Sequence, residues 1–352
     1  MAIIRLNHPN IKCYKAITQQ KTCCSVMTRH LQMKSCAIIG CDGQDGKLLS
    51  EQLQAEGHHV VGIRRNTLNI SDRNEVITFL SELNPQEVYY LAAFHHSSED
   101  EIKIDDAELF NKSFAVHLHG LVHFLEGIKQ SAPACRLLYA ASSHVFGEPA
   151  LSPQNENTPL QPRNVYAISK VAGMEACRYY RKNHGVYAAS AILYNHESPY
   201  RKAKFVSQKI ICGALSIKQG KQEELVLGNL DAAIDWGYAP DYVDAMRRCI
   251  RLKQADDFIV ATGETHTVRE FVEIVFDEVG LDWKKHVRTN PQLLTKSTMP
   301  LKGDATKLRL ATGWRPTMDF VTMVKSLLHA QSGSLVFNSW ISIFLSPVME
   351  LF

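Results

Sequence analysis

Short apolar runs alternate with longer amphipathic segments along most of this chain. The apolar runs have the length of buried strands and lie at residues 34–39, 57–63, 68–72, 87–93 and 135–141. The amphipathic segments have helical periodicity and lie at residues 47–55, 74–83, 109–129 and 166–181. Strands that alternate with helices in this way are typical of a parallel sheet covered by helices. The pattern therefore predicts an α/β fold with a Rossmann-type, doubly wound parallel sheet.

A glycine-rich turn joins the first two predicted elements. Gly40, Gly43 and Gly46 are spaced as G-x-x-G-x-x-G between the first strand and the first helix. Glycines let the backbone approach a ligand closely, and free N–H groups at a helix N-terminus favour an anion such as a pyrophosphate. The spacing differs from the G-x-G-x-x-G of simple dehydrogenases, and an ordinary turn is the alternative. The strand at 57–63 completes a βαβ unit, which favours a dinucleotide site.

Arg64 and Arg65 follow directly after the second predicted strand. An acidic residue at this place would bind the ribose 2′-hydroxyl of NAD, whereas basic residues suit the 2′-phosphate of NADP. Solvated surface arginines are the alternative interpretation. We therefore predict NADP as the cofactor.

Ser142, Tyr166 and Lys170 are candidate catalytic residues. Ser142 follows the strand at 135–141, and Tyr166 and Lys170 are four residues apart on one helical face. An ammonium group beside a phenol favours the phenolate and lowers the phenol's pKa from its usual value of about 10. The serine hydroxyl is suited to bind the same substrate oxygen. A Tyr/Lys pair also arises by chance on surface helices, but the glycine turn in the same chain favours a redox site.

Composition limits the classes of partner. The chain has 352 residues and a formal net charge of +3, which is too small to predict binding to nucleic acid or to an anionic membrane. Its nine cysteines form no C-x-x-C pair, so we predict neither a metal site nor a disulfide framework. This cysteine usage fits a reducing compartment, and we expect a cytoplasmic protein.

The two ends of the chain differ from the rest. Residues 1–33 offer no periodic apolar face, and we expect a loose, dispensable extension. Residues 331–352 form an apolar tail, which is too short and too interrupted to predict a membrane span. The sequence leaves the role of this tail open.

Several motifs carry a resemblance to a known family. They are GCDGQDG (Gly40–Gly46), YNHESP (Tyr194–Pro199), LGNLD (Leu227–Asp231), DWGYAPDYV (Asp235–Val243) and GDATK (Gly303–Lys307). Through them the chain resembles the extended short-chain dehydrogenase/reductases and, within these, the GDP-mannose 4,6-dehydratases. The resemblance implies an NADP-binding domain at residues 34–195, to which residues 241–263 return. It also implies a smaller C-terminal nucleotide-sugar domain from residues 196–240 and 264–330.

The resemblance also assigns roles to individual residues. Ser142 takes the place of the catalytic Ser or Thr, and Tyr166 would accept the proton of the C4 hydroxyl while hydride leaves to NADP. The implied cofactor contacts are Gly40, Gly43, Gln44, Asp45, Gly46, Arg64, Arg65, Asn69, Ile70, Leu91, Ala92, Ala93, Tyr166, Lys170, His196 and Arg201. The implied substrate contacts are Ser143, Asn195, Asn229 and Lys296.

Some positions depart from the family pattern. His144 stands where the family has the Glu that removes the C5 proton, although imidazole is also a base near neutral pH. Ile234 replaces an Arg that contacts the diphosphate, and residues 294–299 offer only Lys296 as a cation. The segment between Arg65 and Asn69, which helps to assemble family tetramers, is much shorter here. We expect a homo-oligomer, specifically a dimer.

Three functions stay open at this point. The main hypothesis is an NADP-dependent nucleotide-sugar 4,6-dehydratase, with a GDP-sugar, GDP-mannose, as substrate. A nucleotide-sugar 4-reductase or epimerase would need only Ser142, Tyr166, Lys170 and the cofactor. The third hypothesis is a cofactor-binding protein without turnover.

Overall fold

The computed structural model describes residues 33–95, 104–290 and 300–345. The expected extension, apart from Met33, and the expected substrate contact Lys296 lie outside these ranges.

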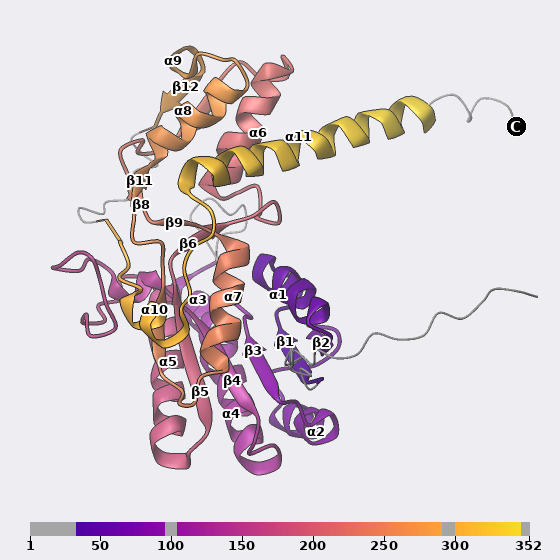
Figure 1. Ribbon diagram of the computed structural model, residues 1–352, viewed down its shortest axis with the longest axis vertical. Coiled ribbons are helices and arrows are strands. Elements are labelled where there is room, and N and C mark those ends of the chain that lie inside the picture. The colour runs from indigo at the N-terminus through magenta and orange to yellow at the C-terminus, as the bar shows by residue number, and fades with distance from the viewer. Residues whose placement is uncertain (1–32, 96–103, 291–299, 346–352) are drawn as a thin grey trace, which may run out of the picture. The chain divides into compact units, whose positions relative to one another are not determined.

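A six-stranded parallel sheet forms the centre of the larger part of the fold (Figure 1). Its strands are β1 (Ser35–Ile39), β2 (His59–Ile63), β3 (Glu87–Tyr90), β4 (Arg136–Ser142), β5 (Tyr187–Leu193) and β10 (Asp257–Val260), in the order β10-β5-β4-β3-β1-β2. Neighbouring strands are parallel throughout. All but the edge strand β2 are buried along nearly their whole length, as expected for a sheet covered on both faces. The predicted α/β fold is confirmed.

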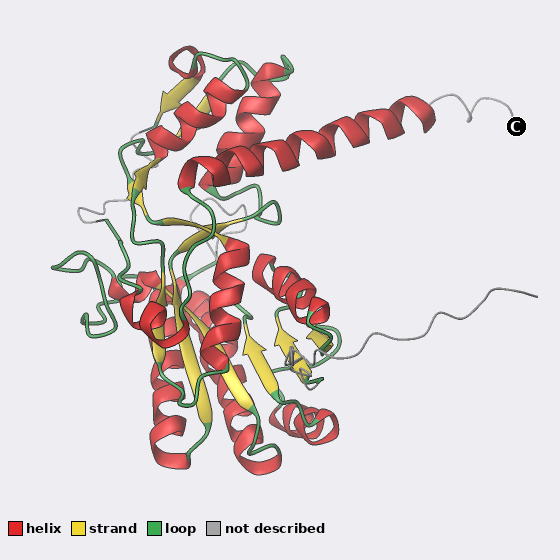
Figure 2. Ribbon diagram, viewed as in Figure 1, coloured by secondary structure: helices red, strands yellow, loops and turns green. Residues whose placement is uncertain are grey.

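Helices flank this sheet (Figure 2). Helix α1 (Gln44–Ala55) packs beside α7 (Ala239–Ile250). In a second group, α4 (Gly120–Ser131) packs against both α2 (Arg73–Leu83) and α5 (Val165–His184), and α3 (Asp106–Phe114) packs on α5. Side-chain caps fix where some of these helices begin, because Asp72 accepts from the first-turn N–H groups of α2 and Asn164 does so for α5.

The second part of the fold has a hydrophobic cluster of its own. Helices α6 (Val206–Lys218), α8 (Val268–Glu278) and α11 (Phe320–Leu345) contact one another around this cluster, which includes Trp236 and Phe271. Short strand pairs accompany them: β6 (Asn195–Glu197) with β9 (Trp236–Tyr238), β7 (Leu225–Leu227) with β12 (Val287–Thr289), and β8 (Ala233–Ile234) with β11 (His266–Thr267). Helix α9 (Trp283–His286) adjoins α8.

Helix α10 (Thr306–Thr312) lies within the range expected for the smaller domain, yet it packs on the sheet. Its Leu308 and the following Trp314 are buried in the cluster around the large sheet, where α7 and β10 also contribute. The indole N–H of Trp314 donates to the carbonyl oxygen of Asp241 at 2.9 Å. The residue boundaries of the two domains stay predictions.

Three predicted elements are wrong in detail. Residues 68–72 form turns instead of a strand, because the Asn69 side chain accepts from the Ser71 N–H and the Asp72 N–H bonds to the Asn69 carbonyl. Such local bonds compete with a sheet ladder. The helix predicted at 109–129 is interrupted by a π-helical turn at Ala115–His119, where the Gly120 N–H bonds to the Ala115 carbonyl. The strand predicted at 87–93 ends already at Tyr90.

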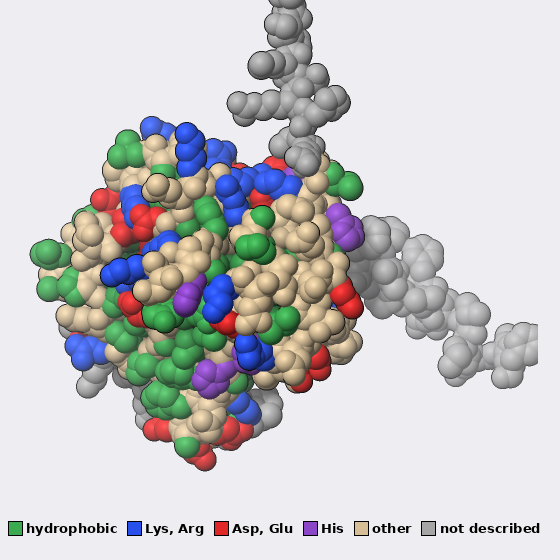
Figure 3. Space-filling model, turned by 90° about the horizontal axis from the view of Figure 1, so that it is seen from below, with side chains coloured by type: hydrophobic (Ala, Val, Ile, Leu, Met, Phe, Trp, Pro, Cys, Tyr) green, Lys and Arg blue, Asp and Glu red, His purple; other side chains and the backbone are tan. Residues whose placement is uncertain are grey.

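One face of the surface carries charges of both signs (Figure 3), and part of the apolar tail is helical. On the face seen from below in Figure 1, acidic and basic side chains are interspersed (Figure 3). Helix α11 takes in the tail as far as Leu345. Among the described helices, none combines the length and the apolar character that a membrane crossing requires.

Candidate active site

The glycine turn brings the start of α1 against the carboxyl end of the sheet. Gly40 has a φ of +93°, which side-chain-bearing residues rarely adopt, and a Cβ there would lie 2.9 Å from the Ala92 backbone nitrogen. A Cβ on Gly46 would lie 2.5 Å from the Gly40 carbonyl oxygen. The turn therefore tolerates no side chain at either position and keeps residues 91–93 beside it.

The two polar residues of the turn, Gln44 and Asp45, reach across to the segment after β5. The Gln44 amide donates to the His196 carbonyl at 3.1 Å and accepts from the Ser198 hydroxyl at 2.9 Å. His196 Nε2 lies 3.0 Å from a carboxylate oxygen of Asp45, while its Nδ1 lies 2.7 Å from the Tyr194 carbonyl. The structure thus brings three of the expected cofactor contacts together from positions 44, 45 and 196.

Opposing effects set the charges of the Asp45–His196 pair. Burial by itself would lower the pKa of His196, but the Asp45 carboxylate outweighs it and the pKa is raised. Burial would raise the pKa of Asp45, but the charge of His196 and its hydrogen bond lower it overall. Both shifts favour the ionised pair.

Four further expected cofactor contacts, Arg64, Arg65, Ile70 and Arg201, lie in the described part of the chain. Arg64 is exposed and pairs with Asp42 of the glycine turn at 3.0 Å, and Arg65 is exposed. The Ile70 carbonyl lies 2.9 Å from His123 Nδ1. Arg201 stacks on the Phe205 ring, with its guanidinium carbon 3.7 Å from the ring centroid.

Tyr166, Ser142 and Lys170 meet where β4 ends and α5 begins. The Ser142 side chain is close enough to the Tyr166 phenol to act on its pKa. Lys170 is 2% exposed, and its Nζ donates to the Ala140 carbonyl at 2.7 Å and lies 5.7 Å from the centroid of the Tyr166 ring. The structure therefore brings the predicted catalytic residues together.

The charges in this group differ from the prediction. Burial lowers the pKa of Lys170 to about 7, with the more distant Asp45 opposing it, and no ion pair joins Lys170 to any described residue. Burial raises the pKa of Tyr166 to about 12, although the Ser142 side chain and the charge of Arg201 act in the lowering direction. The prediction that Lys170 lowers the pKa of the phenol is wrong for this arrangement, because desolvation dominates at both groups.

Three imidazole rings surround the Tyr166 ring. The centroid distances from Tyr166 are 5.3 Å to His117, 5.6 Å to His95 and 6.1 Å to His144. His144 is accessible through the pocket, but the surrounding protein desolvates it and lowers its pKa. Sequence reasoning considered His144 and missed His117, which lies in the π-helical turn. Its only sequence signal was a histidine within the apolar face of a predicted helix.

A cavity of about 470 Å³ adjoins these residues. Three of the expected substrate contacts line it, namely Ser143, Asn195 and Asn229, together with His144. Arg163 also lines it and is the only Lys or Arg among its lining residues in the described part of the chain. Sequence reasoning missed Arg163, although it stands three residues before Tyr166. The arrangement is suited to proton transfer at a polar ligand held against Tyr166 and His144.

Comparisons with known proteins show the family to which the chain belongs. A family model described as "GDP-mannose 4,6 dehydratase" matches residues 67–327. The chain is 35% identical to GDP-mannose 4,6 dehydratase 1 of Arabidopsis thaliana over 327 residues, covering 84% of this chain and 89% of the relative. It is 31% identical to the Homo sapiens GDP-mannose 4,6 dehydratase over 340 residues, covering 83% of this chain and 90% of the relative.

Solved structures share the fold at lower identity. RMD from Pseudomonas aeruginosa, solved with NADPH, matches with a TM-score of 0.73 at 23% identity. The match covers 84% of this chain and 98% of the RMD chain. The Thermus thermophilus UDP-glucose 4-epimerase, solved with NAD, matches with a TM-score of 0.71 at 23% identity. This match covers 85% of this chain and 99% of the epimerase chain.

Proposed function

This chain belongs to the GDP-mannose 4,6-dehydratase family, and on that premise we propose that it removes water from GDP-mannose to give GDP-4-keto-6-deoxy-mannose. The single observation that carries the proposal beyond family membership is the meeting of Ser142, Tyr166 and Lys170 beside the cavity that Asn195, Asn229 and His144 line. Such a site offers two bases: Tyr166 for the proton of the C4 hydroxyl, and His144 for the proton on the neighbouring carbon, C5.

The residues around the glycine turn fit a nicotinamide dinucleotide. Gly40 and Gly46 leave no room for side chains where the backbone closes on the start of α1, and a helix N-terminus favours a pyrophosphate. Gln44, Asp45 and His196 would hold the cofactor on the side of β5. When bound, the dinucleotide supplies the acceptor, and later the donor, of the hydride.

We propose NADP as this cofactor. Arg64 forms an ion pair with Asp42, whereas Arg65, the second residue after β2, is exposed. A guanidinium group binds a phosphate through charge-assisted hydrogen bonds, which a ribose hydroxyl does not match. Arg65 is therefore the residue proposed to select the 2′-phosphate.

The chain's own residues move protons at two places. Tyr166, as phenolate, accepts the proton of the C4 hydroxyl, while the Ser142 hydroxyl binds the same oxygen. A positive charge must favour that phenolate, and the charge of Arg201 acts in this direction on the pKa of Tyr166, against burial. His144 takes the C5 proton. Because burial lowers its pKa, the imidazole stays unprotonated, and so able to accept a proton, at pH values below its usual titration range.

Arg163 is the proposed partner of the diphosphate. Ile234 leaves that side of the cavity without the family's cation. Two carboxylates of the cavity are already bound, because Asp235 accepts from the Gly303 N–H at 3.1 Å and Asp231 pairs with Arg269 at 2.8 Å. Arg163 makes no ion pair with any described residue, so it is the cation best suited to an anionic ligand.

The test is incubation with GDP-mannose and NADP, with UDP- and dTDP-sugars in parallel and the product mass as readout. Loss of one water from GDP-mannose is the expected result. A gain or loss of two hydrogens, or an unchanged mass with altered stereochemistry, would instead identify a reductase or epimerase. No change with any sugar would indicate a protein without turnover.

Variants of His144 separate these outcomes further. His144→Ala should stop formation of the 6-deoxy product but still permit hydride transfer, seen as NADPH fluorescence trapped on the enzyme. His144→Glu should restore the product. Unchanged turnover in His144→Ala would make His144 a wall of the pocket and would favour the epimerase or reductase.

Homodimer formation and a cytoplasmic location stay predictions. Light scattering and localisation of a tagged chain test them.

A further inference from the structure

His117 stands out among the buried polar residues, because the reaction proposed above does not use it. The side chain is 0% exposed, and the preceding helical turn also buries the polar Ser113. It belongs to the π-helical turn at Ala115–His119, and single π-helical turns occur frequently at functional sites. A helix that gives up its regular hydrogen bonding to bury an imidazole needs an explanation.

Hydrogen bonds account for both ring nitrogens of His117. The Phe94 backbone N–H donates to Nε2 at 2.9 Å, which makes Nε2 the acceptor. Nδ1 lies 2.7 Å from the Ser169 hydroxyl, which itself donates to the Tyr166 carbonyl at 2.8 Å. Because the Ser169 proton is used in that bond, Nδ1–H must be the donor to Ser169. The ring is therefore a neutral imidazole with one defined tautomer.

This ring connects two segments that flank the site. Phe94 and His95 follow residues 91–93, which lie against the glycine turn, while Ser169 and Tyr166 form the first turn of α5. The His117 ring also stands nearly perpendicular to the Tyr166 ring, at 89°. A side chain in this place controls where the Tyr166 phenol lies relative to the end of β3.

We propose that His117 is a positioning residue, whose Nδ1–H bond to Ser169 sets the placement of Tyr166 and whose Nε2 bond to Phe94 sets the loop at residues 91–95. The proposal rests on the role proposed for Tyr166. It assigns no proton transfer to His117, because burial and the neighbouring Lys170 and His95 lower its pKa to about 2 and keep it neutral.

Three variants separate the two halves of this arrangement. In His117→Asn the amide nitrogen overlies Nδ1, so the bond to Ser169 survives and the bond to Phe94 is lost. In His117→Gln the amide oxygen reaches toward Nε2, so the bond to Phe94 survives instead. In His117→Leu both are lost. The matched control is His119→Leu, an exposed histidine of the same turn.

Turnover should follow the Ser169 bond. A misplacement of about 1 Å costs on the order of 100-fold in rate, and we expect such a loss of kcat in His117→Leu and His117→Gln, with KM for the sugar nearly unchanged. His117→Asn should recover most of the kcat, and Ser169→Ala should resemble His117→Leu. Equal losses in the Asn and Gln variants, or a rise in KM alone, would overturn the proposal.

A readout without turnover keeps this test independent of the proposed reaction. Nitrogen NMR of histidine-labelled protein should show one imidazole with its proton on Nδ1 that does not titrate between about pH 5 and pH 8 and is absent from His117→Asn. The Tyr166 phenol, followed by ultraviolet absorption against Tyr166→Phe, should change its pKa in Ser169→Ala. A titrating His117, or a phenol pKa unaffected by Ser169→Ala, would refute the arrangement even if GDP-mannose proved not to be the substrate.

Discussion

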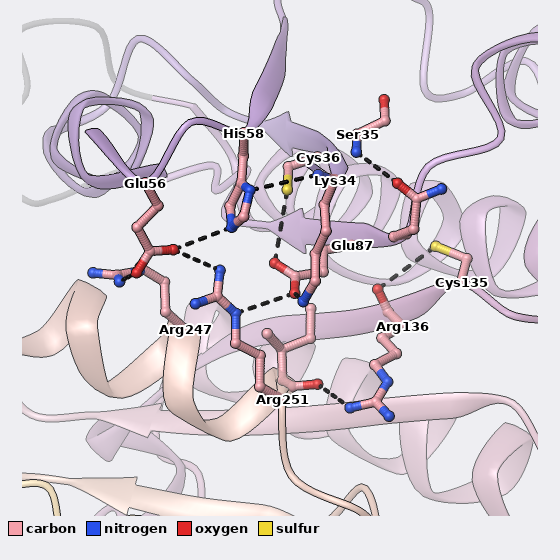
Figure 4. Close-up of polar contacts among 12 residues, drawn as sticks. Lys34, Ser35, Cys36, Glu56, His58, Glu87, Cys135, Arg136, Arg247 and Arg251 are labelled. Carbon is pink, nitrogen blue, oxygen red and sulfur yellow. Dashed lines mark hydrogen bonds and ion pairs between the residues drawn. The ribbon is translucent and has the colours of Figure 1, made fainter. Parts of the chain in front are cut away.

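The two ends of the central sheet both bury charged groups, but they treat them in opposite ways. At the amino ends of the strands, Glu87 is 1% exposed and is surrounded by cations and hydrogen-bond donors (Figure 4). At the carboxyl ends, Lys170 is 2% exposed, and within the described ranges its hydrogen-bond acceptor is a backbone carbonyl, that of Ala140.

The amino-end cluster connects segments that are far apart in the sequence. Glu87 of β3 binds Lys34 before β1 and accepts from Arg251 Nε, after α7, at 3.2 Å. Arg251 and His58 also contact Glu56, at 2.9 Å and 3.2 Å. These ion pairs join the returning helix α7 to the first βαβ unit.

The pKa values record the difference between the two ends. Burial alone would raise the pKa of Glu87, but Lys34 and Arg251 outweigh it and the pKa is lowered, so the group stays charged. Burial lowers the pKa of Lys170 with little compensation, so its charge is poised near neutral pH. A buried charge with partners serves the fold, and one without partners is available for chemistry.

The largest effect is expected at the carboxyl end. Tyr166→Phe should lower turnover by about 10²–10⁴-fold, because it removes the proton acceptor. Cofactor affinity and melting temperature should stay close to those of the wild type, since the phenol does not hold the elements together. Steady-state kinetics, cofactor titration and thermal melts check this, and near-normal rates would contradict the role of Tyr166.

The converse is expected at the amino end. Glu87→Gln should destabilise the protein by about 3 kcal/mol, the low end for breaking a buried pair, because Lys34 and Arg251 keep some contact with solvent. Well below its melting temperature the variant should keep its kcat. Urea unfolding measures the loss, and the exposed Glu82→Gln is the control.

The pH dependence of this difference follows from the sign of the shift. Since the folded pKa of Glu87 is lowered, its stabilisation is present above the unfolded pKa and disappears as the pH falls through the folded value. Wild type and Glu87→Gln should therefore approach equal stability in acid. A constant gap down to acid pH would show that the charge of Glu87 does not account for its contribution.

A smaller effect is expected in the cavity. Arg163→Ala should raise KM for the nucleotide sugar by about 10- to 100-fold with little change in kcat, because a charge-assisted contact is worth about 1.5–3 kcal/mol. Ile234→Arg in the same chain should recover part of the loss. The exposed Arg315→Ala is the control, and an unchanged KM in Arg163→Ala would rule out the diphosphate contact.

The smallest effect is expected at the rim of the glycine turn. Arg65→Ala should weaken NADP about tenfold and leave NAD unaffected, whereas Arg64→Ala should do less because Arg64 already pairs with Asp42. Fluorescence titration with both dinucleotides measures this. If the wild type bound NAD as tightly as NADP, or more tightly, the NADP assignment would be wrong.

The sheet, the glycine turn and the Tyr166–Lys170 pair could all be predicted from the amino-acid sequence. Apolar runs of strand length and helical periodicity are local signals, since each records only which face of an element is buried. The spacing of four residues between Tyr166 and Lys170 is local in the same sense, because one helix carries both. The motifs that indicated the family are likewise continuous stretches.

The tertiary structure alone decided the electrostatics and the partners. It replaced the strand expected at residues 68–72 with turns, placed His117 beneath Tyr166 and joined Asp45 to His196. It also raised the pKa of Tyr166, where the spacing to Lys170 had predicted a lower one. Desolvation depends on every neighbouring group, and those neighbours come from β4, α5 and the π-helical turn, so no single stretch of sequence encodes it.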